Sequence, residues 1–236
     1  MDFQKSSSPA FKGARILASS CGLAVAGLLG SAVSAKGAII VEYEFTGATL
    51  APTTSANGVT TAALTTSGVS GGAGSGFISD GAVTPSGDNQ YSQTGFDDAV
   101  SYFSFIIQPQ EGVTLNLTNL EFYQRLGSTG TNRVYDLQFR VGATGEFTTL
   151  VNDQNASTTT YTLRAAPLGG VTELQNLTSA NPVEFRIVPT LAGADATTFR
   201  IDDLKLEGTV IPEPASLSLI AGAVALCSLR RRRCSH

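Results

Sequence analysis

Most of this 236-residue chain lacks the side chains on which hydrolytic and metal enzymes commonly depend. The three cysteines (Cys21, Cys227 and Cys234) and the one histidine (His236) all lie outside residues 36–210. The body between the chain ends therefore has no disulfide, no thiol nucleophile, no zinc site made of Cys or His, and no histidine base. Serine–histidine–aspartate hydrolysis is excluded, and only carboxylate, tyrosine, hydroxyl or lysine chemistry remains. We therefore predict that the protein is not an enzyme.

Charge is scarce and unevenly placed along the chain. Only 14% of the residues are charged, and there is no tryptophan. Residues 37–210 contain seven Lys and Arg against 17 Asp and Glu, a net charge of −10, while the other basic residues lie near the ends. A body this acidic does not bind nucleic acid by neutralising phosphates. Its charge instead favours solubility and attracts divalent cations.

The N-terminus has the three parts of a secretory signal peptide. Three basic residues lie within the first 15 positions, residues 16–33 are mostly apolar and small, and Val33-Ser34-Ala35 supplies small residues for signal peptidase. This order predicts a helical signal peptide over residues 1–35 that is cleaved after Ala35 and belongs to no folded domain. Two alternatives remain open: lipidation at Cys21, and retention of the apolar segment as an N-terminal helix.

The last 27 residues, 210–236, have a second three-part order. Pro212-Glu213-Pro214 is a stiff, extended joint, because proline disfavours helix in the residue before it. The apolar residues 215–229 follow, and as a helix they would reach roughly 22 Å, less than the ~30 Å hydrocarbon core of a bilayer. Arg230, Arg231, Arg232 and Arg233 come next, and such a basic block stays cytoplasmic. We predict a transmembrane helix that acts as a sorting signal, with an ordinary tail anchor as the alternative.

This tail resembles the PEP-CTERM sorting signal of exported proteins from polysaccharide-producing Gram-negative bacteria. The resemblance covers Pro212-Glu213-Pro214, residues 215–229 and the block Arg230–Arg233, about a tenth of the chain. It implies recognition by a membrane-embedded exosortase, transient anchoring in the inner membrane, and removal of the tail. The protein would then be released into the extracellular matrix or attached to the cell surface.

The body, residues 36–209, reads as strands throughout. Period-two alternation rich in Val, Ile, Phe, Tyr and Thr predicts strands at 38–46, 100–107, 113–122, 134–141, 147–151, 161–163, 183–188 and 199–206. Gly142 and Gly145 bound a hairpin turn, and the glycine-rich stretch 50–96 favours short strands over a mobile region. The best helix-like candidate, 168–177, is short. We predict one all-β domain, an antiparallel β-sandwich of jelly-roll type. Residues 135–141 with the following Gly-Glu-Phe turn, and the closing strand 199–204, are similar in style to the jelly-roll and galactose-binding-like domains of extracellular carbohydrate-binding modules.

The last predicted strand contains an irregularity that suggests a metal site. Phe199 and Ile201 share a face with Leu204 and Leu206 only if an extra residue is inserted at Asp202-Asp203, which predicts a β-bulge. In many jelly-roll modules the first and last strands adjoin and share a structural calcium ion. By that resemblance Glu42 or Glu44 would meet Asp202 or Asp203, supplying oxygen ligands that suit calcium. The alternative is that all four carboxylates are ordinary surface residues.

These observations predict an exported structural or adhesive protein of the cell envelope or matrix, associated with exopolysaccharide. Two alternatives remain: a pure carbohydrate-binding module, and a polysaccharide-active enzyme based on carboxylates. An enzyme of that kind requires two carboxylates about 5–10 Å apart in a cleft.

Overall fold

The computed structural model describes residues 37–67, 76–79, 89–93, 101–127, 134–156, 159–190 and 198–213. The predicted signal peptide with Ala35, Pro214, the predicted membrane helix and the block Arg230–Arg233 lie outside these residues. Within the described part of the chain, no helix is long and apolar enough to cross a membrane.

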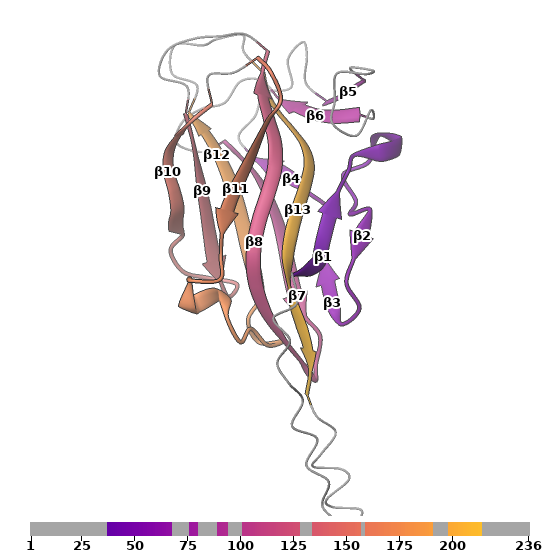
Figure 1. Cartoon of the computed structure of the whole chain (residues 1–236), viewed down its shortest axis with the longest axis vertical. Coiled ribbons are helices and arrows are strands. Elements are labelled where there is room, and N and C mark those ends of the chain that lie inside the picture. The colour runs from indigo at the N-terminus through magenta and orange to yellow at the C-terminus, as the bar shows by residue number, and fades with distance from the viewer. Residues whose placement is uncertain are drawn as a thin grey trace, which may run out of the picture. The chain divides into compact units, whose positions relative to one another are not determined.

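The first sheet, here called sheet A, has seven strands (Figure 1). Its main path contains, in spatial order, β11 (Thr162–Pro167), β8 (Val113–Leu126), β13 (Phe199–Pro212), β1 (Ala38–Tyr43) and β2 (Thr54–Ser55). Beside this path β6 (Asn89–Gln93) pairs with β13, and β5 (Gly76–Ser79) pairs with β6. The two longest strands, β8 and β13, are adjacent and antiparallel, so they form the centre of the sheet.

The second sheet, sheet B, has six strands. Its path contains β10 (Thr148–Asn155), β9 (Val134–Val141), β12 (Val183–Thr190), β7 (Tyr102–Pro109) and β3 (Val59–Thr61), and β4 (Thr65–Ser67) also pairs with β7. The single-turn 3-10 helices η1 (Thr46–Ala48) and η3 (Thr172–Leu174) complete the described elements. The prediction of an all-β body made of two antiparallel sheets is confirmed, as are the short strands between residues 50 and 96.

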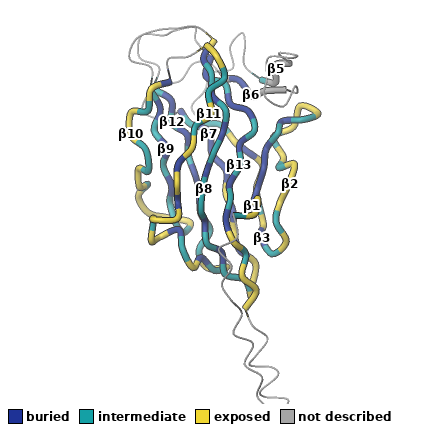
Figure 2. The backbone as a smooth tube through the Cα atoms, viewed as in Figure 1, coloured by how far each residue is buried: buried dark blue, intermediate teal, exposed yellow. Residues whose placement is uncertain are grey.

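Aromatic side chains join the two sheets across the core. Tyr43 of sheet A lies 5.6 Å from Phe105 of sheet B between ring centroids, and Phe105 stacks on Phe185 at 5.3 Å. Buried residues run along the strands of both sheets (Figure 2). Successive side chains of a strand point to opposite faces of the sheet. Where every second residue is buried in the core, the residues between them therefore lie on the outer face.

The predicted bulge in the last strand is confirmed. Asp202 pairs with Tyr123, and the next registered pair is Lys205 with Glu121, so β13 has one residue more than β8 in this interval. Asp203 adopts a left-handed φ of 45°. The inserted residue brings one group of apolar side chains into the core, namely Phe199, Ile201, Leu204 and Leu206.

The body extends further along the chain than its predicted end at residue 209. Strand β13 continues to Pro212, which pairs with Val113 of β8. The Glu213 N–H then donates a hydrogen bond to the Gly112 carbonyl at 2.8 Å. A proline is tolerated at the end of a strand because its missing N–H interrupts no further ladder bond. The first residues of the predicted tail are therefore part of sheet A.

Candidate functional site

Strands β1 and β13 lie side by side, as predicted, but their register places a cation opposite the first carboxylate. Glu42 pairs with Lys205, and the Lys205 Nζ lies 3.0 Å from Glu42 Oε1. The Thr54 hydroxyl also donates to Glu42 Oε2 at 3.4 Å. Burial lowers the pKa of Lys205, but the hydrogen bond and charge of Glu42, with the charges of Asp203 and Glu121, raise it above its ordinary value. The Glu42 carboxylate is thus neutralised by an ammonium group.

The other three predicted calcium ligands form no common cage with Glu42. Asp202 is fully buried and accepts a hydrogen bond from the Asp203 N–H at 3.0 Å, while Glu44 is half-buried. In the ranges that the structure describes, no group of three or more Asp, Glu, His or Cys side chains could hold a metal ion. Calcium binding stays a prediction, and an ion would have to compete with Lys205 for Glu42.

A cluster of charged and aromatic side chains lies on the outer face of sheet B. It consists of Tyr102, Arg140, Phe147, Glu184 and Arg186, and we call it the arginine platform. Glu184 accepts hydrogen bonds from Arg140 Nη2 at 2.6 Å and from Arg186 Nε at 2.9 Å. Bonds of this kind to an ionised acceptor are about twice as strong as neutral ones. One carboxylate therefore holds two guanidinium groups in place.

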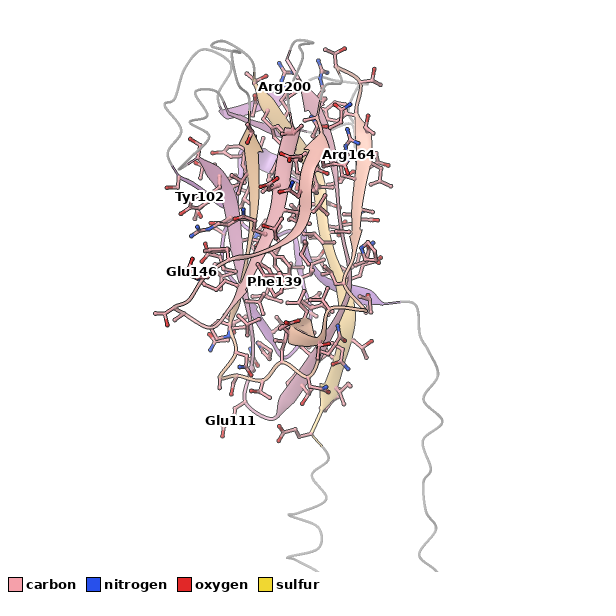
Figure 3. All side chains as sticks on the ribbon, turned by 90° about the vertical axis from the view of Figure 1, so that its left-hand side faces the viewer. Tyr102, Glu111, Phe139, Glu146, Arg164 and Arg200 are labelled. Carbon is pink, nitrogen blue, oxygen red and sulfur yellow. The ribbon has the colours of Figure 1, made fainter. Side chains whose placement is uncertain are left out.

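Aromatic rings fix the plane of one guanidinium. The central carbon of Arg186 lies 3.9 Å from the ring centroid of Tyr102 and 3.7 Å from that of Phe147, so the guanidinium contacts both rings. The Arg140 guanidinium also lies over Phe147, at 4.7 Å. Planar arginine stacks well on aromatic faces, whereas lysine does not. Figure 3 shows Tyr102 pointing outward from the sheet.

Strand alternation explains how the platform forms. Phe103, Phe105, Phe185 and Ile187 face the core, so their neighbours Tyr102, Glu184 and Arg186 face outward. The register of β12 with β9 places Glu184 opposite Arg140. The hairpin from β9 to β10 then brings Phe147 beside both arginines.

The sandwich also has a cleft of about 210 Å³ between edge strands β10 and β11. Phe122, Leu137 and Leu163 supply apolar walls, and Tyr135, Gln154 and Arg164 supply polar groups. The residues that line the cleft, all within the described part of the chain, include no carboxylate. No local pattern in the sequence indicated this cleft, because its lining residues come from strands far apart in the chain.

Two residues of the predicted sorting motif, Pro212 and Glu213, lie within the described residues. Pro212 and Glu213 are exposed; Pro212 is the last residue of β13, and Glu213 follows it. The predicted extended joint therefore begins at the last residue of strand β13.

No family model and no curated protein matches this chain. Among solved structures, it is similar to the CBM22-1 xylan-binding domain of Xyn10C from Paenibacillus barcinonensis, with 12% identity over 74% of this chain and 97% of that one, at a TM-score of 0.43. It is also similar to a CBM4 structure, with 14% identity over 62% and 94% of the two chains, at a TM-score of 0.36. A third is TmCBM61 in complex with β-1,4-galactotriose, with 12% identity over 59% and 86%, at 0.33. These scores assign neither a family nor a ligand to this chain.

Proposed function

We propose that this protein is an exported, non-catalytic β-sandwich of jelly-roll type that adheres to extracellular polysaccharide through the arginine platform. The observation that carries the proposal is the Arg186 guanidinium held against the rings of Tyr102 and Phe147 on the outer face of sheet B, where the Arg186 side chain is 21% exposed. This arrangement keeps planar donors and aromatic surface at fixed positions. A preorganised surface loses little conformational entropy when a ligand binds.

The surroundings of the platform suit a sugar chain. Arg186 has Ser104 of β7 and Gln138 of β9 as cross-strand neighbours. Ser104 is buried and bonded to the Thr65 hydroxyl, so the half-buried Gln138 supplies the neutral polar group on this face. Ile106, opposite Glu184, is 42% exposed and supplies an apolar contact beside them. Sugars offer both hydroxyl groups and apolar ring faces, so a surface that alternates these features is complementary to them. The breadth of sheet B favours an extended chain over a single sugar.

The chain ends would deliver this surface to the outside of the cell. In this proposal signal peptidase cleaves after Ala35, and an exosortase recognises Pro212-Glu213-Pro214 while the tail is in the inner membrane. The exposure of Pro212 and Glu213 at the end of β13 supports the accessibility that such recognition needs. The mature protein would then lie in the cell envelope or matrix.

The cleft supports a binding role over a catalytic one. A glycoside hydrolase of the usual kind needs two carboxylates flanking the scissile bond. The cleft between β10 and β11 is lined instead by one arginine, one glutamine, one tyrosine and apolar groups, all described residues. Sugar release from matrix polysaccharide by the purified protein would refute the non-catalytic assignment.

Affinity electrophoresis tests the binding surface. The mature protein purified from its host would be run in gels that contain the extracellular polysaccharide of that host, with dextran gels as a reference. We expect Arg186→Gln to weaken retention by about tenfold, equivalent to ~1.4 kcal/mol. Arg200→Gln is the matched control, because Arg200 lies on β13 of sheet A. Equal retention of wild type and folded Arg186→Gln would refute the platform as the binding surface.

Cell fractionation tests the sorting route. Mass spectrometry of the protein from hosts with and without exosortase should show loss of residues 1–35 in both hosts. Loss of the C-terminal tail should occur only when exosortase is present. An intact, arginine-ended protein in the cytosol of the normal host would refute the proposed export.

A further inference from the structure

The cleft between β10 and β11 contains Arg164, which pairs with no carboxylate among the described residues. Its apolar lining residues are Phe122 and Leu137, which are buried, and Leu163, which is exposed. Arg164 projects from β11 toward the interior, because its register partner Phe122 is a core residue. Figure 3 shows Arg164 on the opposite side of the view from Tyr102, which belongs to the arginine platform. The cleft is therefore a second surface, built from side chains that the platform does not use.

Neutral groups hold the Arg164 guanidinium in position. Its Nη2 donates to the Asn155 carbonyl at 2.7 Å and to the Gln124 Oε1 at 3.2 Å. Gln124 is itself fully buried and donates through Nε2 to the Ala156 carbonyl at 3.1 Å, which fixes the amide. The two acceptors of Arg164 carry no charge, and among the described residues no carboxylate forms an ion pair with it. The orientation of the guanidinium is thus set while its charge is left for a ligand.

A hydroxyl donor lines the same cleft. Burial raises the pKa of Tyr135 to about 12, although the charge of Arg164 acts in the opposite direction. The hydroxyl consequently keeps its proton at neutral pH and is a hydrogen-bond donor. With Arg164 and the Gln154 amide, it gives the cleft three donors beside the apolar side chains of Phe122, Leu137 and Leu163.

We propose that this cleft binds the carboxylate-bearing ring of an acidic sugar, of which a uronate is the simplest. The carboxylate would accept hydrogen bonds from Arg164, and the ring would lie against the apolar walls. A volume of about 210 Å³ is below the roughly 300–1,000 Å³ of ordinary ligand pockets, so the cleft suits one sugar unit. The inference rests on the proposed function only in taking a sugar as the ligand.

Isothermal titration of the mature protein with glucuronate tests this site, with glucose and glucuronate methyl ester as neutral controls. We expect saturable binding of glucuronate that is at least about tenfold tighter than that of either control, since hydrogen bonds to charged groups contribute more than neutral ones. Arg164→Gln should weaken glucuronate binding about tenfold, and Arg200→Gln, on β13 and outside both the cleft and the platform, should leave it unchanged. Equal binding of glucuronate and glucose would overturn the inference.

Arg164→Gln could lower binding by destabilising the fold, because Arg164 also links β11 to the Asn155 carbonyl of β10. A second variant separates these two effects. If Arg164→Gln melts well below wild type, Tyr135→Phe decides the result, since it keeps the ring and removes only the hydroxyl. It should weaken glucuronate binding a few-fold, and unchanged affinity would overturn the inference. The two proposals can fail separately. If the wild-type protein binds glucuronate and Arg186→Gln is retained by polysaccharide as strongly as wild type, the platform is not the polysaccharide-binding surface, but the proposal for the cleft is supported.

Discussion

Arg186→Lys separates the charge of the arginine platform from its stacking. Lysine keeps the positive charge beside Glu184 but loses the planar contact with the rings of Tyr102 and Phe147. A cation–π contact contributes about 0.5–1 kcal/mol at exposed sites and about 2 kcal/mol when desolvated. The Arg186 side chain is 21% exposed, so we assign roughly 1 kcal/mol to each ring. Since lysine retains part of the attraction to a ring, we expect a loss of about 1–2 kcal/mol in the free energy of unfolding.

Thermal unfolding followed by circular dichroism measures this loss. For a domain of this size each kcal/mol corresponds to about 2–4 °C, so Tm should fall by roughly 2–8 °C. Arg186→Met is the companion variant, because it removes the charge as well and leaves Glu184 with Arg140 alone. The difference between the two variants should shrink at high salt, while the effect of Arg186→Lys should persist. A Tm for Arg186→Lys within 1 °C of wild type would refute a stabilising role for the stack.

Three further substitutions test the framework of sheet A. Asp203→Val should be less stable than Asp203→Gly by about 1–2 kcal/mol in urea unfolding, because a φ of 45° strains a β-branched residue; equal midpoints would contradict the bulge geometry. Gly208→Ala should cost about 1–3 kcal/mol, since its Cβ would overlap the Asn116 backbone oxygen of β8, whereas Gly170→Ala, with nothing within 4 Å, should be nearly neutral. Lys205→Met tests the pH dependence: the pairing with Glu42 raises the Lys205 pKa, so the folded state holds this proton more tightly than the unfolded chain. Its contribution is complete below about pH 10.4 and is lost as the pH rises through the folded pKa. The stability difference from wild type should therefore be full at neutral pH and should shrink as the pH rises through the raised pKa of Lys205; a difference that does not change with pH would contradict the ion pair.

Local patterns in the sequence located the main strands and the bulge. The predicted strand 38–46 was too long: β1 ends at Tyr43, because Phe45 takes a left-handed φ of 57° before a 3-10 turn. Residues 134–141 alternate without interruption, and β9 has the predicted bounds. The apolar residues of the last strand fall out of phase at Asp202-Asp203, and an inserted residue is found there. These features depend on neighbours only a few positions apart. A period of two can therefore be recognised without knowledge of the fold.

The partner of each charged side chain could not be recognised in the same way. Glu42 was expected to face Asp202 or Asp203, because the first and last strands were expected to adjoin. They do adjoin, but the register of the pair places Glu42 opposite Lys205. A shift of a single residue changes which side chains meet on a face, and the bulge in β13 adds such a shift.

The sequence by itself determined the chemical inventory of this protein: a body without thiol or imidazole, acidic overall, and alternating into strands that bury one face. Only the tertiary structure decided where the remaining reactive and binding groups gather. Arg140 comes from β9, Phe147 from the turn after it and Arg186 from β12. Arg164 lines a cleft between the edge strands of the two sheets. The physical reason is one of range: alternation is local in the chain, whereas strand order and register result from burying both inner faces at once.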